Sequence, residues 1–188
     1  MIIGVTGTFA SGKDTVSDYL VEKGYFHFSL SDAIRRECEK RGLPKDRDTL
    51  RDLANKMREE EGFDILAKRA LETIKESEEK NVVVTSIRNP KEAEFLKKQD
   101  DFILIAVDAP IKIRYERIKS RQREDDFIDF EKFQHQEKME MAGGEGKQNI
   151  GQIIQMADHI IINDGTLEEL NEKINEFINT VPMASGTQ

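Results

Sequence analysis

The fold of this chain is decided by the stretch Gly7-Thr8-Phe9-Ala10-Ser11-Gly12-Lys13-Asp14-Thr15. A short apolar run, Ile2–Val5, precedes it, and the segment that follows, Val16–Val21, has helical apolar spacing. A strand, a glycine-bounded loop, a lysine and a helix in this order are typical of the phosphate-binding pattern G-x-x-x-x-G-K. We therefore expect a nucleoside triphosphate to bind at this stretch.

Each part of the stretch has an expected role in holding the triphosphate. The backbone N–H groups of the loop can curl around a phosphate, and the amino end of the following helix adds positive partial charge. Lys13 supplies a mobile point charge for the outer phosphates. Asp14 stands where a Ser or Thr hydroxyl usually meets Mg²⁺, and Thr15 follows one position later. We assign Mg²⁺ to these two residues, directly or through water. The loop residues assigned to the nucleotide are Gly7, Thr8, Ala10, Ser11, Gly12, Lys13, Asp14 and Thr15.

Length and charge restrict the class of protein. The chain has 188 residues and a formal net charge of −8. This length suits one domain with a substantial core, which we place at residues 1–180, followed by a loose tail at 181–188. The acidic balance argues against a general nucleic-acid or membrane-surface binder. Any anionic ligand must therefore be held by locally clustered arginines.

Cysteine usage and apolar runs bear on the compartment. The single cysteine, Cys38, excludes an internal disulfide and suits a reducing compartment. The sequence has no apolar run near 18 residues, and Met1 leads directly into a strand without a signal-peptide pattern. We therefore expect a soluble, cytoplasmic monomer or homodimer. Its partners are expected to be small-molecule nucleotide substrates, with no nucleic acid and no membrane.

Apolar runs predict five strands separated by charged helical stretches. The runs at 82–84, 103–107 and 160–162 are continuously apolar, as in parallel strands covered on both faces. Alternating strands and helices predict an α/β fold with right-handed crossovers, in which ligands lie beyond the carboxyl ends of the strands. The expected strands are Ile2–Thr6, Tyr25–Ser29, Val82–Ser86, Phe102–Val107 and His159–Ile162. The expected helices are Lys13–Glu22, Asp32–Arg41, Thr49–Glu60, Asp64–Glu79, Pro90–Lys98, Ile111–Arg121, Phe130–Met141, Gln148–Met156 and Leu167–Asn179.

The second strand is followed by candidate substrate-binding residues. Ser31 or Asp32 is expected to cap the next helix, and Arg35 lies one turn on, beside Asp32. We assign Arg35 to a substrate phosphate, and Asp32 to orienting a substrate hydroxyl or taking its proton. The structural alternative is a helix cap with a surface ion pair.

The third strand ends in Thr85-Ser86-Ile87-Arg88. Arg88 is a second candidate for the acceptor phosphate, its alternative being an arginine at a helix cap that faces water. Thr85 and Ser86 stand where many phosphoryl-transfer enzymes place an aspartate that holds Mg²⁺. The sequence therefore leaves the metal ligands undecided.

The helix after the fourth strand carries a row of arginines. Arg114, Arg117 and Arg121 share one side of it, and Arg123 opens the irregular segment 122–147. That segment is expected to be a flap over the site or a solvent-facing loop and helix. We assign phosphate contacts to the row, although a charged helix face often means only solvation.

The fifth strand is followed by Asn163-Asp164-Gly165-Thr166, which is turn chemistry. Thr166 and Glu169 form a predicted capping box. We assign Asn163 to the nucleotide, as part of a loop that lies against the base mainly through its backbone.

The junctions together resemble the P-loop nucleoside monophosphate kinase family, adenylate kinase-like, and its close relative dephospho-CoA kinase. The resemblance runs from Met1 to about Phe177. Gly7–Thr15 is similar to the family's G-x-x-x-x-G-K-x-T loop, Ser31–Arg35 to its G-D-x-x-R segment, and Ser86–Arg88 to its second acceptor arginine. Ala157–Gly165 is more like dephospho-CoA kinases and some phage deoxynucleotide kinases. The arginines that resemble the start of the family's lid are Arg117, Arg121 and Arg123.

The resemblance implies a fold and an activity. The fold is a five-stranded parallel sheet of order 2-3-1-4-5 with helices on both faces and a lid at about 122–147. The activity is transfer of the γ-phosphoryl group of ATP, with Mg²⁺, to a nucleotide-like acceptor. Lys13, Arg117, Arg121 and Arg123 would stabilise the transferring group, and Asp32 would serve as base for a hydroxyl acceptor. The acceptor is a (deoxy)nucleoside monophosphate or dephospho-CoA, and a nucleotide-binding regulatory module with little turnover is the alternative.

Overall fold

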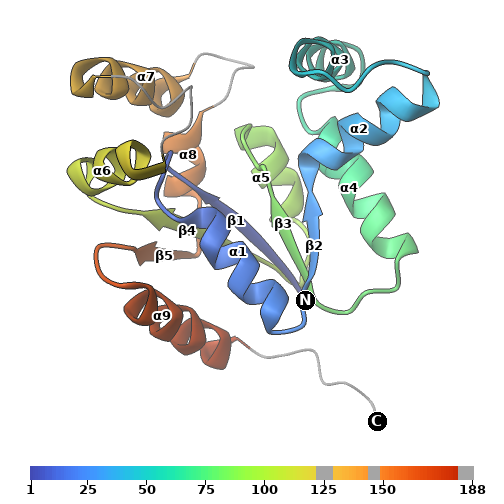
Figure 1. Cartoon of the computed structure of the whole chain (residues 1–188). Coiled ribbons are helices and arrows are strands. Elements are labelled where there is room, and N and C mark those ends of the chain that lie inside the picture. The colour runs from blue at the N-terminus through green and yellow to red at the C-terminus, as the bar shows by residue number, and fades with distance from the viewer. Residues whose placement is uncertain (122–128, 144–148, 182–188) are drawn as a thin grey trace.

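In the computed structural model, which describes residues 1–121, 129–143 and 149–181 apart from the side chains of Arg47 and Arg121, a parallel sheet lies between two layers of helices (Figure 1). The strand order is β2-β3-β1-β4-β5, so the predicted order 2-3-1-4-5 is confirmed. The strands are β1 (Ile2–Gly7), β2 (Phe26–Ser29), β3 (Val82–Thr85), β4 (Phe102–Asp108) and β5 (His159–Ile162).

Each predicted helix is present, with ends that differ from the prediction by three residues at most. Among the described residues, none of these helices combines the length and apolar character needed to cross a bilayer. The helices are α1 (Lys13–Glu22), α2 (Leu30–Lys40), α3 (Arg47–Glu61), α4 (Ile65–Glu76), α5 (Pro90–Leu96), α6 (Ile111–Arg121), α7 (Phe130–Ala142), α8 (Ile150–Gln155) and α9 (Leu167–Thr180).

The core has a large cluster on each face of the sheet. Ile3 and Val5 of the central strand face α1 and α9, while Ile2 joins the cluster built from α2, α3, α4, α5 and α8. Cys38 is fully buried in the second of these clusters, as its helical context predicts. Strand β1 is the central strand and is buried on both faces, so the loop after it starts from the middle of the sheet.

One expectation about the strands is wrong. The run 160–162 was expected to be covered on both faces, but Ile160 and Ile162 are 48% and 43% exposed, while Ile161 between them is 2% exposed. The reason is that β5 is an edge strand. On the face opposite α9, α8 packs against β1 and β4 and leaves β5 open.

The helix starts follow local capping chemistry. The box at α9 is confirmed, since the Glu169 N–H donates to Thr166 Oγ1 at 3.2 Å and the Thr166 N–H to Glu169 Oε2 at 2.8 Å. The prediction that Ser31 or Asp32 caps α2 is wrong. Ser29 is the cap, and Asp32 Oδ2 accepts a hydrogen bond of 3.2 Å from the Ser29 N–H. The box places the cap three residues before its acidic member.

Two predicted irregular segments are only partly described. Of the segment 122–147, the described part forms α7, and the rest lies outside the described residues, as does 182–188. Val181 was expected to begin the loose tail, but it is 9% exposed and packs with the cluster beside α9.

A buried ion pair holds the start of α5. The Glu92 side chain is fully buried and pairs with Arg58 of α3 at 3.2 Å. Its other oxygen accepts the N–H groups of Arg88 and Asn89, each at 3.0 Å. Burial raises the pKa of the Glu92 carboxyl, although Arg58 and the two N–H donors oppose that shift. The network fixes the junction that carries Arg88.

We expect Glu92→Ala to lower the free energy of unfolding by about 3–5 kcal/mol, because Arg58 then stays buried without its partner. Glu92→Gln should cost less, since an amide oxygen still accepts the two N–H groups. The native carboxyl holds its proton more tightly than the unfolded one, so wild-type stability should fall as pH rises above 4.5. Urea unfolding of the three proteins across pH 4–8 checks this. A constant difference between Glu92→Gln and wild type would contradict it.

Candidate nucleotide site

The loop between β1 and α1 has a backbone that two glycines make possible. Gly7 has φ +152°, and a Cβ there would lie 2.1 Å from the Val107 carbonyl oxygen of β4. Gly12 has φ +95°, and a Cβ there would lie 2.3 Å from Asn163 Nδ2. Both positions therefore exclude any side chain, through backbone conformation and through space.

The conformation of the loop suits a bound anion. Ala10 has φ +60°, so left-handed residues occur on both sides of Ser11, a pattern that turns successive N–H groups toward one concavity. Gly12 is the N-cap of α1, and in this described part of the chain no side chain caps that helix end. The hydroxyl of Ser11 is buried and has no hydrogen-bond partner among the residues that the structure describes. These observations fit the phosphates of a nucleotide.

The outer side of the loop is held by the ends of β4 and β5. Thr8 Oγ1 donates to Asp108 Oδ1 at 2.8 Å, and Asn163 Nδ2 donates to the Ser11 carbonyl oxygen at 2.8 Å. Asn163 is 6% exposed. Its side chain was predicted to matter little beside its backbone, yet that side chain supports the phosphate loop directly.

Arg117 lies behind the loop. Its Nη2 donates to the Asn163 carbonyl oxygen and to Asn163 Oδ1, each at 3.1 Å, and its Nη1 reaches the Ser11 carbonyl oxygen at 3.4 Å. The structure thus brings Arg117 to the loop that was predicted to hold the nucleotide. In this arrangement it contacts the loop's backbone.

Arg114 corrects the prediction of a row of phosphate-binding arginines. It is 4% exposed, and its Nε donates to the Ala109 carbonyl oxygen at 2.7 Å. Its other nitrogens donate to the Phe9 carbonyl oxygen, at 3.3 Å, and to the Glu137 carboxylate. Burial among these acceptors makes Arg114 part of the framework. The side chain of Arg121 and all of Arg123 lie outside the described residues.

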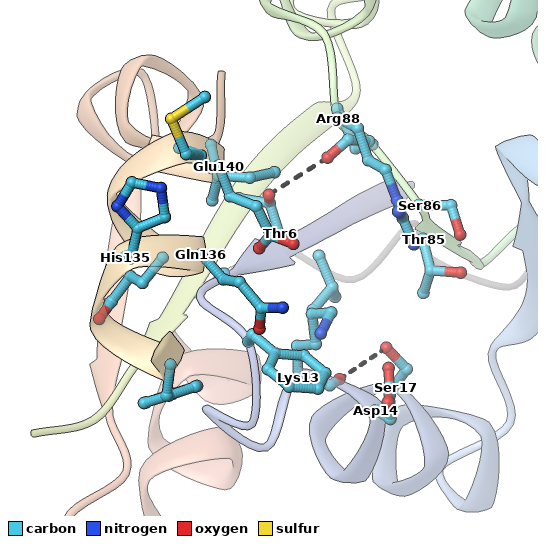
Figure 2. Close-up of a pocket in the computed structure, with 18 of the residues that line it drawn as sticks. Thr6, Lys13, Asp14, Ser17, Thr85, Ser86, Arg88, His135, Gln136 and Glu140 are labelled. Atoms are coloured by element: carbon cyan, nitrogen blue, oxygen red, sulfur yellow. Dashed lines mark hydrogen bonds between the residues drawn. The ribbon is translucent and has the colours of Figure 1, made fainter. Parts of the chain in front are cut away.

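A cavity of about 920 Å³ opens beside the loop, and Figure 2 shows Lys13 within it. Its walls come from the loop and α1, from the end of β3 and from α7. The residues that line it include Gly7, Phe9, Lys13, Asp14, Ser17, Thr85, Ser86, Arg88, Lys132, His135, Gln136, Glu137, Met139 and Glu140. A volume of this size accommodates a nucleotide-sized ligand.

The two predicted acceptor arginines are placed differently. Arg88 is exposed and lines the cavity. Arg35 does not line it and pairs with Asp32 at 3.2 Å on the surface of α2, where both side chains are nearly half exposed. The surface ion pair of the structural alternative is observed, whereas Asp32 is the acidic member of the capping box and Ser29 is the cap. Asp32 is connected to the cavity through Ser29, whose hydroxyl donates a hydrogen bond of 2.8 Å to Oγ of Ser86 in the cavity wall.

The candidate metal ligands also differ in position. Asp14 is exposed and lines the cavity, whereas Thr15 is half-buried outside the lining. Within the described ranges no group of three His, Cys, Asp or Glu side chains is arranged to hold a metal ion. Mg²⁺ in phosphate sites keeps several waters and uses one or two carboxylates besides the phosphates. Asp14 fits such a minimal set.

Sequence reasoning offered the segment 122–147 as a flap over the site but assigned no residue of α7 to it. Lys132, Gln136, Met139 and Glu140 line the cavity from one stripe of this helix. Figure 2 shows Gln136 and Glu140, with His135 nearby. The signal is their helical spacing of three and four residues. The stripe contains charged side chains, an amide and a methionine. It therefore lacks the apolar periodicity that would have predicted a helix face lining a cavity.

Comparison with known proteins places the chain in a family. Residues 3–143 match a family model described as an AAA domain. A UPF0200 protein of Pyrococcus abyssi is 35% identical over 186 residues, which are 96% of this chain and 97% of the relative. A UPF0200 protein of Sulfurisphaera tokodaii is 36% identical over 180 residues, with shares of 96% and 97%. The chain belongs to the UPF0200 family.

A further UPF0200 relative is longer. The UPF0200/UPF0201 protein of Archaeoglobus fulgidus is 35% identical over 181 residues, which are 94% of this chain and 54% of the relative. The chain therefore spans about half the length of that UPF0200 relative.

Solved structures show the fold of this UPF0200 chain. TT1252 from Thermus thermophilus superposes with a TM-score of 0.63 at 18% identity, covering 97% of this chain and 98% of the other. Dephospho-CoA kinase from Campylobacter jejuni gives 0.61 at 16% identity and 96% of each chain. Shikimate kinase from Acinetobacter baumannii, in complex with shikimate, gives 0.56 at 20% identity, covering 95% and 93%. The chain has the fold of P-loop kinases, and at these identities the likeness concerns the fold alone.

We expect Gly12→Ala to weaken ATP binding by at least about tenfold, because the new Cβ displaces Asn163 and with it the Ser11 carbonyl. Gly24→Ala is a matched control at the other end of α1. Gly24 has φ +92° but no atom within 4 Å of the added Cβ, so this variant carries the backbone strain alone. Calorimetric titration with ATP and thermal unfolding of both variants check the prediction. Equal ATP affinities in the two variants would contradict it.

Proposed function

We propose that this protein transfers the γ-phosphoryl group of ATP, with Mg²⁺, to a nucleotide-like acceptor, a (deoxy)nucleoside monophosphate. The observation that carries the proposal is that Lys13, after β1, and Arg88, after β3, line one cavity beside a loop shaped for phosphate. Two cations from two strand ends are what a donor and an acceptor phosphate require when they meet in line.

The donor side is built from the loop. Its N–H groups and Lys13 would hold the β- and γ-phosphates, and Asp14 and Thr15 are the proposed ligands of Mg²⁺, directly or through water. Bound Mg²⁺ supplies charge neutralisation between the two phosphates. Catalysis then consists mainly of positioning and electrostatic stabilisation, which preorganised donors provide. Arg121 and Arg123 remain proposed contacts of the donor phosphates.

The placement of carboxylates bears on the acceptor. A phosphate oxyanion needs no general base, whereas a hydroxyl acceptor needs a carboxylate within hydrogen-bond reach. Asp32, proposed for that role, lies outside the cavity, and its oxygens bond to the Ser29 N–H and to Arg35. This arrangement favours the monophosphate acceptor.

A second candidate is phosphorylation of a ribose hydroxyl, as in a dephospho-CoA kinase. The observation in its favour is that two carboxylates, Asp14 and Glu140, line the cavity and are exposed. In this reaction Glu140 is the base candidate, because Asp14 is already proposed for the metal.

A coupled assay with ATP·Mg²⁺ against a panel of nucleoside and deoxynucleoside monophosphates and dephospho-CoA tests the proposal. Turnover with a monophosphate supports it, and turnover with dephospho-CoA alone supports the second candidate. Tight ATP binding without transfer to any acceptor indicates a nucleotide-binding regulatory module instead.

We expect Lys13→Ala to lower kcat/KM by a factor on the order of 10² to 10³, because lost transition-state charge is not replaced. Lys23→Ala is the control, since Lys23 lies at the other end of α1, over the ring of Tyr19. The control should retain wild-type kinetics. Turnover of Lys13→Ala within a few-fold of the control would remove Lys13 from the reaction.

Arg88→Ala should raise the KM of the acceptor by about tenfold or more and change that of ATP little, because Arg88 lines the cavity at the end of β3. Arg35→Ala tests whether Arg35, the other proposed acceptor arginine, also binds the acceptor. If Arg35 binds the acceptor, its loss raises the same KM. If the ion pair with Asp32 is only a surface contact, initial-rate kinetics of Arg35→Ala will match wild type.

A further inference from the structure

The outward carbonyls of the phosphate loop are held from behind by three side chains, those of Arg114, Arg117 and Asn163. An anion-binding loop must turn its N–H groups inward, which turns carbonyl oxygens outward. The Ser11 carbonyl is bound by Asn163 and Arg117, and the Phe9 carbonyl is bound by Arg114. Without these donors the outward oxygens would be buried without partners, or the loop would rotate to satisfy them.

Arg114 connects three separate segments of the chain. Its guanidinium bonds to the Ala109 carbonyl after β4, to the Phe9 carbonyl of the loop and to the Glu137 carboxylate of α7. Glu137 is largely buried, with 14% of its side chain exposed. A planar fork with several fixed donors can satisfy these acceptors at once, which an ammonium cannot.

Aromatic side chains also connect the phosphate loop with α7. The rings of Phe9 and Phe133 are 6.3 Å apart, and the Arg114 guanidinium lies 5.8 Å from the centre of the Phe133 ring. Phe133 is 1% exposed and shares a small core with Ala10 and Ile118. This core lies between the loop, α6 and α7, so the wall of the cavity and the phosphate loop are packed as one unit.

We propose that Arg114 is a positioning residue for the nucleotide site, which fixes the Phe9 carbonyl outward and ties α7 to the loop through Glu137. The inference rests on the proposed function, since it assigns how the donor site of that reaction is preorganised. Arg114 itself contacts no substrate in this assignment, because its donors are directed to protein acceptors.

The test separates positioning from stability. In the double variant Arg114→Met/Glu137→Leu both charges are removed together, and a buried ion pair replaced by apolar residues of similar volume often leaves stability unchanged or higher. We expect this variant to unfold cooperatively at a somewhat lower temperature than wild type, because the Ala109 and Phe9 carbonyls lose a donor, while its Kd for ATP rises by about tenfold. Glu137→Gln keeps that donor and removes only the carboxylate charge at the cavity wall, so the rise in Kd of the double variant over Glu137→Gln measures the loss of the Arg114 contact.

The matched control is Lys119→Met/Glu116→Leu, which removes an exposed ion pair of α6 that spans 3.7 Å. It should leave the Kd for ATP unchanged. Calorimetric titration with ATP and with a non-hydrolysable analogue measures all variants without requiring turnover. Wild-type ATP affinity in a folded Arg114→Met/Glu137→Leu protein would overturn the inference and leave the proposed kinase activity standing. ATP binding without transfer in the wild type would overturn the activity and leave the inference standing, and a wild type that binds no ATP would overturn both.

Discussion

The candidate site depends on the hydrogen bonds that fix the outward carbonyl oxygens of the phosphate loop. An array of N–H groups that faces an anion is unstable unless the opposite side of each peptide finds donors of its own. Here those donors are the side chains of Arg114, Arg117 and Asn163. They come from the segments after β4 and β5, so three strands of the sheet, β1, β4 and β5, lead to the loop and its support.

The same arrangement explains how an acidic protein can hold a polyanion. The net charge of −8 would repel a nucleotide at long range, so attraction must come from charges placed within a few ångströms. Lys13 and Arg88 supply mobile charge at the cavity, whereas Arg114 is neutralised by Glu137 and acts through geometry. Cations that attract the ligand and cations that shape its site are therefore different residues.

Much of the fold could be predicted because it depends on local signals. Apolar runs, three of them continuous, predicted the strands, and the loop at Gly7–Lys13 predicted a candidate site at the centre of the sheet. Long-range contacts could not be predicted in this way. The spacing of Arg114 and Arg117 gave their side of α6 but not their acceptors, among them two loop carbonyls about a hundred residues earlier. The exposure of Ile160 likewise depends on which strand lies at the edge.

The bonds from Arg114 and Arg117 to the loop end on main-chain oxygens, at Phe9 and Ser11. Every amino acid carries such an oxygen, so this support does not depend on which side chain occupies position 9. Substitutions at position 9 therefore need not change the backbone conformation of the phosphate loop. Homologous proteins could exchange Phe9 for residues of other size or polarity, and so alter the rim of the cavity, while inheriting the same phosphate cradle.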